Sequence, residues 1–389
     1  MSHAEAASPL DPDAPLDAED ARLRPTYAVV SLPRLRDNMA AVKAHASPAR
    51  VMAILKANAY GHGLEAVARC LAPQADAFGV ALLEEGIALR RLGIDNPILV
   101  MGGIWTRQIP LFLRHHLTLT VPSLARLRDV EEAAAAARAT ARVHLEIDTG
   151  MERIGVHYYN AETLLEAAAR SPHVAVEGIY SHFANADAED LSDARRQLER
   201  FLDALRFYER RSLPTPLRHI SNSAALLRMR ESHLDFVRPG ILVYGVYPYP
   251  EAPRTVEVKP ALAWKSRVVF FKVVEGGSPV SYGSTWRSDH PVRIVTVPVG
   301  YGDGYFRSMS NRAQVILRGQ RHPEVGRICM DQIMVNIEWG SAYNGDEVVL
   351  IGEQGGERVT VEELAEWAGT VPYEILTAIN ARVPRLYEP

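Results

Sequence analysis

The chain has 389 residues, of which 47% are apolar and 23% are charged, a composition typical of a globular protein and unlike that of a disordered chain. Lys and Arg total 43 against 47 Asp and Glu, a formal net charge of −4 with no basic stripe, so nucleic acid and anionic membranes are poor candidate partners. No apolar run reaches the roughly 18 residues that a membrane helix needs. The 2 cysteines lie far apart and form no ligand or disulfide pattern, so we expect metal-free chemistry in a reducing compartment.

Residues 1–24 differ from the rest of the chain. They hold six acidic residues and two arginines among Ala, Ser and Pro, with no apolar periodicity, and we expect a disordered acidic tail. The segment lacks the basic start and apolar stretch of a signal peptide, which favours a cytoplasmic location.

Short apolar runs recur after the tail, and helical patterns lie between them. The runs cover residues 51–55, 77–82, 97–101, 117–121, 143–147, 174–180, 217–220 and 236–243. The helical patterns cover residues 63–71, 83–92, 123–138, 161–169 and 190–211. Near-continuous apolar strands are typical of parallel sheets buried on both faces. Eight of them alternating with helices predict an α/β fold, a TIM-like (β/α)8 barrel, over residues 25–251. A doubly wound open sheet is the alternative, but the first strand is not followed by a GxGxxG turn.

The pattern changes after residue 251. Strand-like runs with Gly and Asp between them cover residues 264–274, 292–299, 314–317, 332–337 and 347–351. Thr360 is a plausible N-cap for a helix over residues 361–368. We therefore predict a second, mainly β domain over residues 252–389.

Polar residues follow several strands of the predicted barrel at their carboxyl ends, where barrel enzymes carry their active sites. They are Lys56, Glu146, Asp148, Ser181, His182, His219, Asn222, Ser223, Arg238 and Gly240. The Ser223 hydroxyl and the Gly240 and Ile241 amides come after the last two strands, where barrels often bind phosphate. We therefore expect a phosphorylated ligand beside a lysine.

Lys56 ends the first strand, and two explanations fit it. It is either a lysine that extends to the surface or a Schiff-base lysine, whose pKa must be lowered by burial or by a nearby cation. Arg153 and Arg238, at other strand ends, could supply that cation. With a phosphate site opposite, the second explanation favours pyridoxal 5'-phosphate as the cofactor.

Nine short motifs follow one another along both predicted domains. In the barrel they are Lys56-Ala-Asn-Ala-Tyr60-Gly-His-Gly, Asp148-Thr-Gly-Met151-Glu-Arg153, Ser181-His182-Phe-Ala, Asn222-Ser223-Ala-Ala and Val237-Arg238-Pro-Gly-Ile241. Beyond it they are Val280-Ser-Tyr282-Gly-Ser-Thr-Trp286, Val299-Gly-Tyr301-Gly-Asp-Gly-Tyr305, Gly326-Arg327-Ile-Cys-Met330-Asp331-Gln332 and Arg382-Val-Pro-Arg385. Together they resemble the motifs of the alanine racemase family over nearly the whole chain.

The resemblance implies a pyridoxal-phosphate enzyme that interconverts L- and D-alanine and supplies D-alanine for peptidoglycan. It implies that Lys56 holds the cofactor and serves as one base. Tyr282 would be the opposite base, donated across the interface of a homodimer. Removal of the α-proton on one face and its return on the other would invert the α-carbon.

Further roles also follow from the resemblance. Arg238 would face the pyridine nitrogen with His219 supporting it, and His182 would lie near the cofactor ring. Tyr60, Ser223 and the Gly240 and Ile241 amides would hold the phosphate. Arg153 and the Met330 amide, the latter from the partner subunit, would bind the substrate carboxylate. Tyr301 and Arg327 resemble residues lining the family's substrate corridor, and Asp331 would be a supporting residue beside Met330.

Two positions depart from the family pattern. Glu146 stands seven residues before Arg153, where many members carry a carbamylated lysine that holds the arginine. We expect the Glu146 carboxylate to take over that role. Ala381 stands where some members have a tyrosine that narrows the entrance, which leaves strict alanine specificity open.

Three other functions compete with alanine racemisation. A broader-specificity, serine or basic amino-acid racemase of the same family is the runner-up. A pyridoxal-phosphate decarboxylase would need a carboxylate where Arg238 stands. Single-domain relatives that bind the cofactor without known catalysis lack the β domain that carries Tyr282 and Met330.

Overall fold

The computed structural model describes residues 24–389. The predicted acidic tail therefore lies outside the described residues, except for Arg24. The chain forms two compact units. The barrel unit consists of Val30–Ala263, Thr360–Asn380 and Tyr387–Pro389, and the β unit consists of residues 24–29, Trp264–Val359 and Ala381–Leu386.

Eight parallel strands close into a barrel in the barrel unit. They are β2 (Arg50–Ile54), β3 (Ala77–Val80), β4 (Ile98–Val100), β5 (Thr118–Val121), β6 (Ala141–Asp148), β8 (Val174–Tyr180), β9 (Leu217–His219) and β10 (Phe236–Val237). Each pairs with the next, and β10 pairs with both β9 and β2, which closes the ring. Strands β3, β4 and β5 are buried along their whole length, as expected for strands covered on both faces. The predicted (β/α)8 barrel is confirmed.

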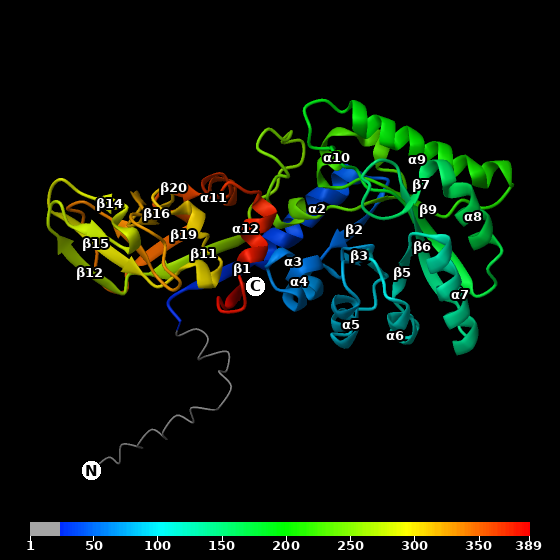
Figure 1. The fold of residues 1–389 in the computed structure, drawn as a ribbon, viewed down its shortest axis with the longest axis horizontal. Helices are drawn as coiled ribbons and strands as arrows, with labels where there is room; N and C mark the ends of the chain where they lie inside the picture. Colours follow the sequence, from blue (N-terminus) through cyan, green and yellow to red (C-terminus); the bar gives the residue numbers. More distant parts are fainter. Residues whose placement is uncertain (1–23) are drawn as a thin grey trace, which may run out of the picture. The chain divides into compact units, whose positions relative to one another are not determined.

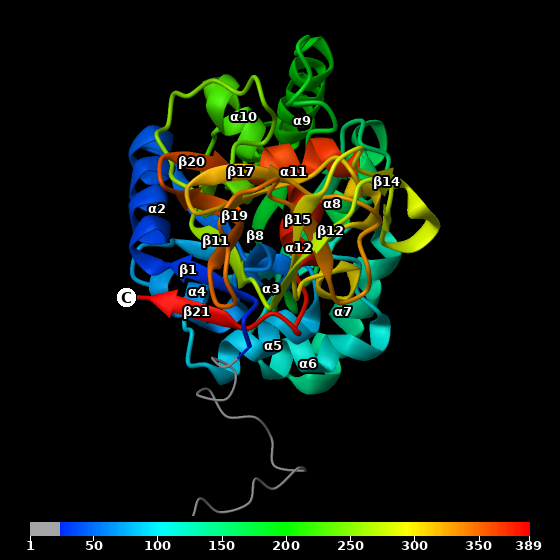
Figure 2. The ribbon, with the colours of Figure 1, turned by 90° about the vertical axis from the view of Figure 1, so that its left-hand side faces the viewer.

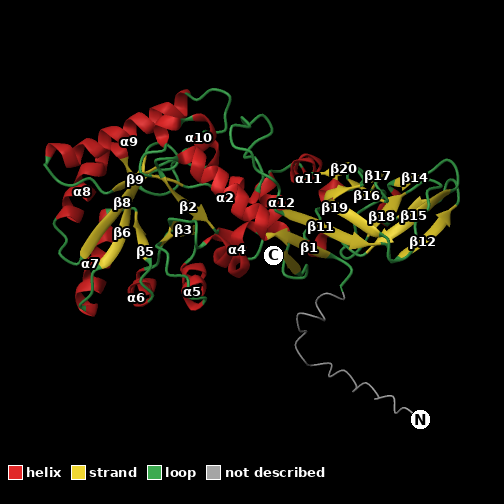
Figure 3. Cartoon of the chain, turned by 180° about the vertical axis from the view of Figure 1, so that it is seen from behind, coloured by secondary structure: helices red, strands yellow, loops and turns green. Residues whose placement is uncertain are grey.

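Helices lie outside the strands (Figures 1 and 3). They are α4 (Leu64–Leu71), α5 (Leu83–Arg91), α6 (Ile109–Arg114), α7 (Leu124–Ala137), α8 (Ala161–Ala169), α9 (Ser192–Arg210) and α10 (Ser223–Arg228). Helices α6 and α10 were not among the predicted segments, and neither was α2 (Leu32–Ala46), which precedes the barrel. The strand predicted at residues 236–243 is shorter in the structure, where β10 covers only Phe236–Val237. Pro239 has no N–H to donate to a neighbouring strand, and the chain turns into a 3₁₀ segment at Ile241–Tyr244.

Strands dominate the β unit. They are β11 (Leu262–Arg267), β12 (Phe270–Val274), β13 (Pro279–Val280), β14 (Trp286–Arg287), β15 (Val292–Val297), β16 (Gln314–Leu317), β17 (Gln320–Pro323), β18 (Ile333–Asn336), β19 (Glu347–Gln354) and β20 (Glu357–Val359). The chain's first and last strands, β1 (Tyr27–Ser31) and β21 (Arg385–Glu388), extend the sheet beyond β11, as Figure 2 shows in blue and red. The predicted mainly β second domain is confirmed.

The two units do not follow the linear division predicted at residue 251. Helices α11 (Val361–Ala368) and α12 (Pro372–Ala378) belong to the barrel unit, because α12 packs against the short turn α3 (Lys56–Tyr60) that follows β2. Thr360 caps α11 as predicted, its hydroxyl accepting the Glu363 N–H at 3.1 Å. None of the helices in residues 24–389 is both long and apolar enough to cross a membrane.

Candidate active site

A cavity of about 700 Å³ opens at the carboxyl ends of the barrel strands. The parallel strands all end at this rim, so residues far apart in sequence meet there. Nine of the residues singled out in the sequence line it: Lys56, Tyr60, Glu146, Arg153, His182, Ser223, Arg238, Gly240 and Ile241. His219 lies behind Arg238 and hydrogen-bonds to it.

Lys56 begins an unusual backbone turn. Residues 57–60 all have φ between 52° and 54°, the left-handed region, although none is glycine. Such a conformation costs roughly 1–2 kcal/mol per residue, so its surroundings must hold it. The Ala57 N–H donates to Glu85 at 2.6 Å, and the Asn58 side chain accepts the Leu64 N–H at 2.8 Å. As a result, Lys56 and Tyr60 both reach the cavity from one short turn.

The pKa of the Lys56 amine is lowered. Burial is the largest cause, and the Arg153 and Arg238 charges add to it, while Glu85 opposes it. Only the neutral amine can attack a carbonyl carbon, so this environment favours a nucleophilic lysine.

Tyr60, Ser223, Gly240 and Ile241 form one end of the cavity. The Ser223 hydroxyl accepts the Gly240 N–H at 2.9 Å, so this amide, which was expected to hold a phosphate, is already paired within the protein. A Cβ on residue 240 would lie 2.4 Å from the Tyr60 hydroxyl, so the close approach requires glycine. Neither the Tyr60 hydroxyl nor the Ile241 N–H has a hydrogen-bond acceptor within residues 24–389. Donors without acceptors around a cavity fit an anion with several oxygens, such as a phosphate.

Arg238 is 3% exposed and forms the centre of a hydrogen-bond network. Its guanidinium donates to His219 Nδ1 at 2.7 Å, to His182 Nδ1 at 3.1 Å and to the Ser181 carbonyl at 2.8 Å. Burial lowers the Arg238 pKa to about 10, so the group stays charged at neutral pH. Burial and then the Arg238 charge lower the pKa of both histidines, which keeps them neutral acceptors.

Glu146 is buried and accepts a hydrogen bond from the Tyr180 hydroxyl at 2.9 Å. Burial raises its pKa to about 7, although the Tyr180 hydrogen bond and then the Arg238 and Arg153 charges act in the opposite direction. Neither a hydrogen bond nor an ion pair joins Glu146 to Arg153 in the part of the chain that the structure describes. Glu146 and Arg153 therefore interact only through their electrostatic attraction here, and not through the direct contact expected from the sequence.

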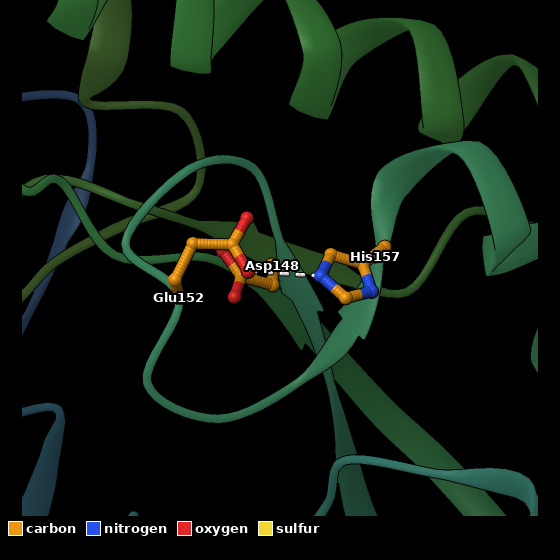
Figure 4. A group of neighbouring side chains, drawn as sticks. All are labelled: Asp148, Glu152 and His157. Atoms are coloured by element: carbon orange, nitrogen blue, oxygen red, sulfur yellow. Dashed lines mark hydrogen bonds and ion pairs between the residues drawn. The ribbon is translucent and has the colours of Figure 1, made fainter.

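Arg153 lies in the segment between β6 and β7. Asp148, Glu152 and His157, which Figure 4 shows, tie this segment down. Asp148, the last residue of β6, accepts the Gly150 and Met151 N–H groups at 2.8 and 3.0 Å. Glu152 pairs with His157 of β7 (Val156–His157) at 2.9 Å. Asp148, Glu152 and His157 each place one side-chain oxygen or ring nitrogen within 4.8 Å of the other two. These contacts fix the loop that presents Arg153 to the cavity.

The remaining predicted residues belong to the β unit. The Tyr301 N–H donates to the Cys329 carbonyl at 3.1 Å and the Gly302 N–H to the Met330 carbonyl at 2.8 Å, which aligns the two motifs. The Ser281 hydroxyl donates to the Arg327 carbonyl at 2.6 Å and so places Tyr282 beside Arg327.

Large side chains of this group are open to solvent. Tyr282 is 70% exposed, Met330 52% and Tyr301 42%. Asp331 pairs with Arg382 at 2.6 Å. The β unit thus presents exposed aromatic and apolar side chains together, which is unusual for residues without a partner.

Several site residues were not found by sequence reasoning. Tyr180 and Tyr373 line the cavity, and His144 hydrogen-bonds to His219 at 2.8 Å. A signal for His144 existed, because it stands two residues before Glu146 and so faces the same side of β6. Tyr373 gave no local signal, since only the docking of α12 brings it to the cavity.

The chain matches known families over both units. The family model of the alanine racemase N-terminal domain matches residues 30–248, and that of the C-terminal domain matches residues 261–387. The alanine racemase of Carboxydothermus hydrogenoformans is 44% identical over 368 residues, which is 94% of this chain and 100% of the relative. That of Symbiobacterium thermophilum is 44% identical over 367 residues, 94% and 97% of the two chains.

Solved structures agree with the sequence comparisons. The alanine racemase of Streptomyces coelicolor A3(2) aligns with a TM-score of 0.91 at 36% identity, over 95% of this chain and 99% of the other. The alanine racemase of a D-cycloserine-producing Streptomyces lavendulae aligns with a TM-score of 0.87 at 36% identity, over 94% and 97%. In sequence, in fold and in the motifs that line its cavity, this chain belongs to the alanine racemase family.

Proposed function

We propose that this protein is an alanine racemase that uses pyridoxal 5'-phosphate to interconvert L- and D-alanine. The observation that carries the proposal is the cavity itself, in which a lysine of lowered pKa lies together with hydrogen-bond donors that lack acceptors. When bound, the cofactor supplies an electron sink that makes the α-proton of an amino acid acidic.

The residues of the cavity would hold each part of the cofactor. The Lys56 amine would be the attachment point. The hydroxyls of Tyr60 and Ser223 and the Ile241 amide would donate to the phosphate. Arg238 would face the pyridine nitrogen, and because a guanidinium has donors only, it would leave that nitrogen without a proton. A weaker electron sink limits side reactions such as transamination.

Two bases would then act on opposite faces of the substrate. Lys56 Nζ takes or returns the α-proton on one face, and the Tyr282 hydroxyl does so on the other, which inverts the α-carbon. We assign Tyr282 and Met330 to the site of a second copy of the chain in a homodimer. Their exposure within the β unit supports this assignment. Arg153 and the Met330 amide bind the substrate carboxylate.

The cellular role follows from the reaction. A racemase of this kind would work in the cytoplasm and supply D-alanine for peptidoglycan. We infer both the location and the supply of D-alanine from the family.

The test is racemisation of a panel of L-amino acids by the cofactor-loaded protein. Alanine should react fastest, with serine, lysine and arginine slower. Lys56→Ala should abolish the reaction, whereas Lys43→Ala, which alters a lysine paired with Asp76 outside the cavity, should keep it. A cofactor-loaded protein that racemises no amino acid, or a Lys56→Ala variant of wild-type rate, would refute the proposal. A clear preference for serine or a basic amino acid would favour the runner-up.

A further inference from the structure

A line of polar side chains runs through the interior of the barrel away from Arg238. Arg238 Nη1 lies 2.7 Å from His219 Nδ1, and His219 Nε2 lies 2.8 Å from His144 Nδ1. The three side chains are 3%, 0% and 5% exposed, so water does not compete for these contacts. His144 belongs to none of the motifs singled out in the sequence.

The direction of each hydrogen bond follows from the chemistry of the groups. A guanidinium only donates, so His219 Nδ1 must accept and its proton must be on Nε2. His219 Nε2–H then donates to His144 Nδ1, and the His144 proton must be on its own Nε2. Burial, and after it the Arg238 charge, lowers the His144 pKa to about 3, so this ring is neutral. The Arg238 guanidinium therefore determines the tautomers of both rings.

Two packing features hold the rings in place. The His144 ring lies against Gly178 of the neighbouring strand, where an added Cβ would be 2.6–2.7 Å from three ring atoms. The β6–β8 pairing has a register shift between Val143 and His144, which sets His144 opposite Gly178. The His219 ring stacks on Tyr180 with the centroids 4.8 Å apart and the planes within 6°.

His144 also lines a second cavity, of about 370 Å³, formed by the amino-terminal parts of the strands. Arg50, Arg142 and Glu177 are among its lining residues. A cavity of this size with charged residues in its lining has room for water, which can accept the His144 Nε2–H. The chain of hydrogen bonds that starts at Arg238 therefore ends at this second cavity.

We propose that His144 is a positioning residue for Arg238: by accepting the Nε2–H of His219, it holds the His219 ring in the orientation in which Nδ1 accepts from the guanidinium. Without that acceptor, the His219 Nε2–H is buried without a partner, the ring can turn away, and Arg238 loses a hydrogen bond. The orientation of the ring is a property of the folded chain, whereas its consequence for catalysis rests on the proposed function.

The test is nitrogen-15 NMR of the imidazole rings in the histidine-labelled, cofactor-loaded protein. His144→Phe keeps a flat ring but removes the acceptor. The His219 Nδ1 resonance should then move toward that of a ring nitrogen that accepts no hydrogen bond. His144→Asn should restore the wild-type resonance, because its carbonyl oxygen is as many bonds from Cβ as Nδ1 is. The His233→Phe control, at another histidine 5% exposed, should leave His219 unchanged.

A second variant keeps the test decisive if His144→Phe does not fold. Gly178→Ala retains the imidazole but displaces it, and should shift the His219 Nδ1 resonance in the same direction. An unaltered His219 in a folded His144→Phe or Gly178→Ala protein would overturn the proposal.

Kinetics separate this inference from the proposed function. Loss of a residue that supports a bound group costs about 10–100-fold in affinity or activity, and here we expect the loss in kcat more than in KM. A shifted His219 Nδ1 resonance with unchanged kcat would overturn the positioning role while leaving the racemase proposal intact. A wild-type protein with the Nε2–H tautomer but no racemase activity would refute the racemase proposal alone.

Discussion

Glu146→Gln should change how the stability of the protein depends on pH. Glu146 is 3% exposed, and burial raises its pKa from 4.5 to about 7. Between these two values the folded protein binds more protons at Glu146 than the unfolded chain does. Stability therefore falls as pH rises from about 4.5 to about 7, and the full loss is present above that range. A difference of about 2.5 pH units corresponds to about 3 kcal/mol.

Glutamine has nearly the same shape but cannot ionise. Its carbonyl can still accept the hydrogen bond from Tyr180. Burying its amide lowers the free energy of unfolding by an amount that does not vary with pH. We expect the Glu146→Gln variant to gain about 3 kcal/mol relative to wild type between about pH 4 and about pH 8. Urea unfolding of the cofactor-saturated proteins, followed at several pH values, measures the difference.

Tyr180→Phe provides a directional control. It removes the hydrogen bond that favours the ionised carboxylate, so the Glu146 pKa should rise further. Infrared titration of the protonated carboxyl group, with Glu146→Gln as the blank, should show a midpoint near 7 in wild type and a higher one in Tyr180→Phe. A stability difference that stays constant with pH, or a carboxyl group that titrates like an exposed glutamate, would refute the reasoning.

Three other predictions address the cofactor and the second copy. Borohydride treatment of the loaded protein should leave a phosphopyridoxyl group on Lys56 by peptide mapping, and the same adduct in Lys56→Ala would contradict the assignment. Mixed Lys56→Ala and Tyr282→Phe chains should recover about a quarter of wild-type activity, because about half of randomly assorted dimers are mixed and each has one intact site of two. No recovery despite proven subunit exchange would argue against a shared site. Gly240→Ala should weaken cofactor binding about 10–100-fold in a fluorescence titration, since its Cβ would displace the Tyr60 hydroxyl and remove a hydrogen bond to a charged group. Unchanged affinity would count against this phosphate site.

The barrel could be predicted because its signals are local and repeated. Each buried strand is a short apolar run, and the carboxyl ends of parallel strands must share one rim. That rule alone placed Lys56, Glu146 and Arg238 near one another, as they are in the cavity. The Thr360 cap was also predictable, because capping depends on residues only three positions apart.

Other features had no local signal. Residues 57–60 adopt a left-handed turn that no propensity favours, and only contacts such as the hydrogen bond to Glu85 hold it. The docking of α12 beside α3 brings Tyr373 to the cavity from more than 300 residues away.

The sequence by itself determined the fold class, the order of the elements, the family and the identity of most cavity residues. Tertiary structure alone decided the hydrogen-bond partners of those residues. Glu146 bonds to Tyr180 and not to Arg153, and His219 lies between Arg238 and His144. The physical reason is that a motif specifies which groups reach the rim, whereas burial and the spacing between neighbouring strands decide which donor meets which acceptor.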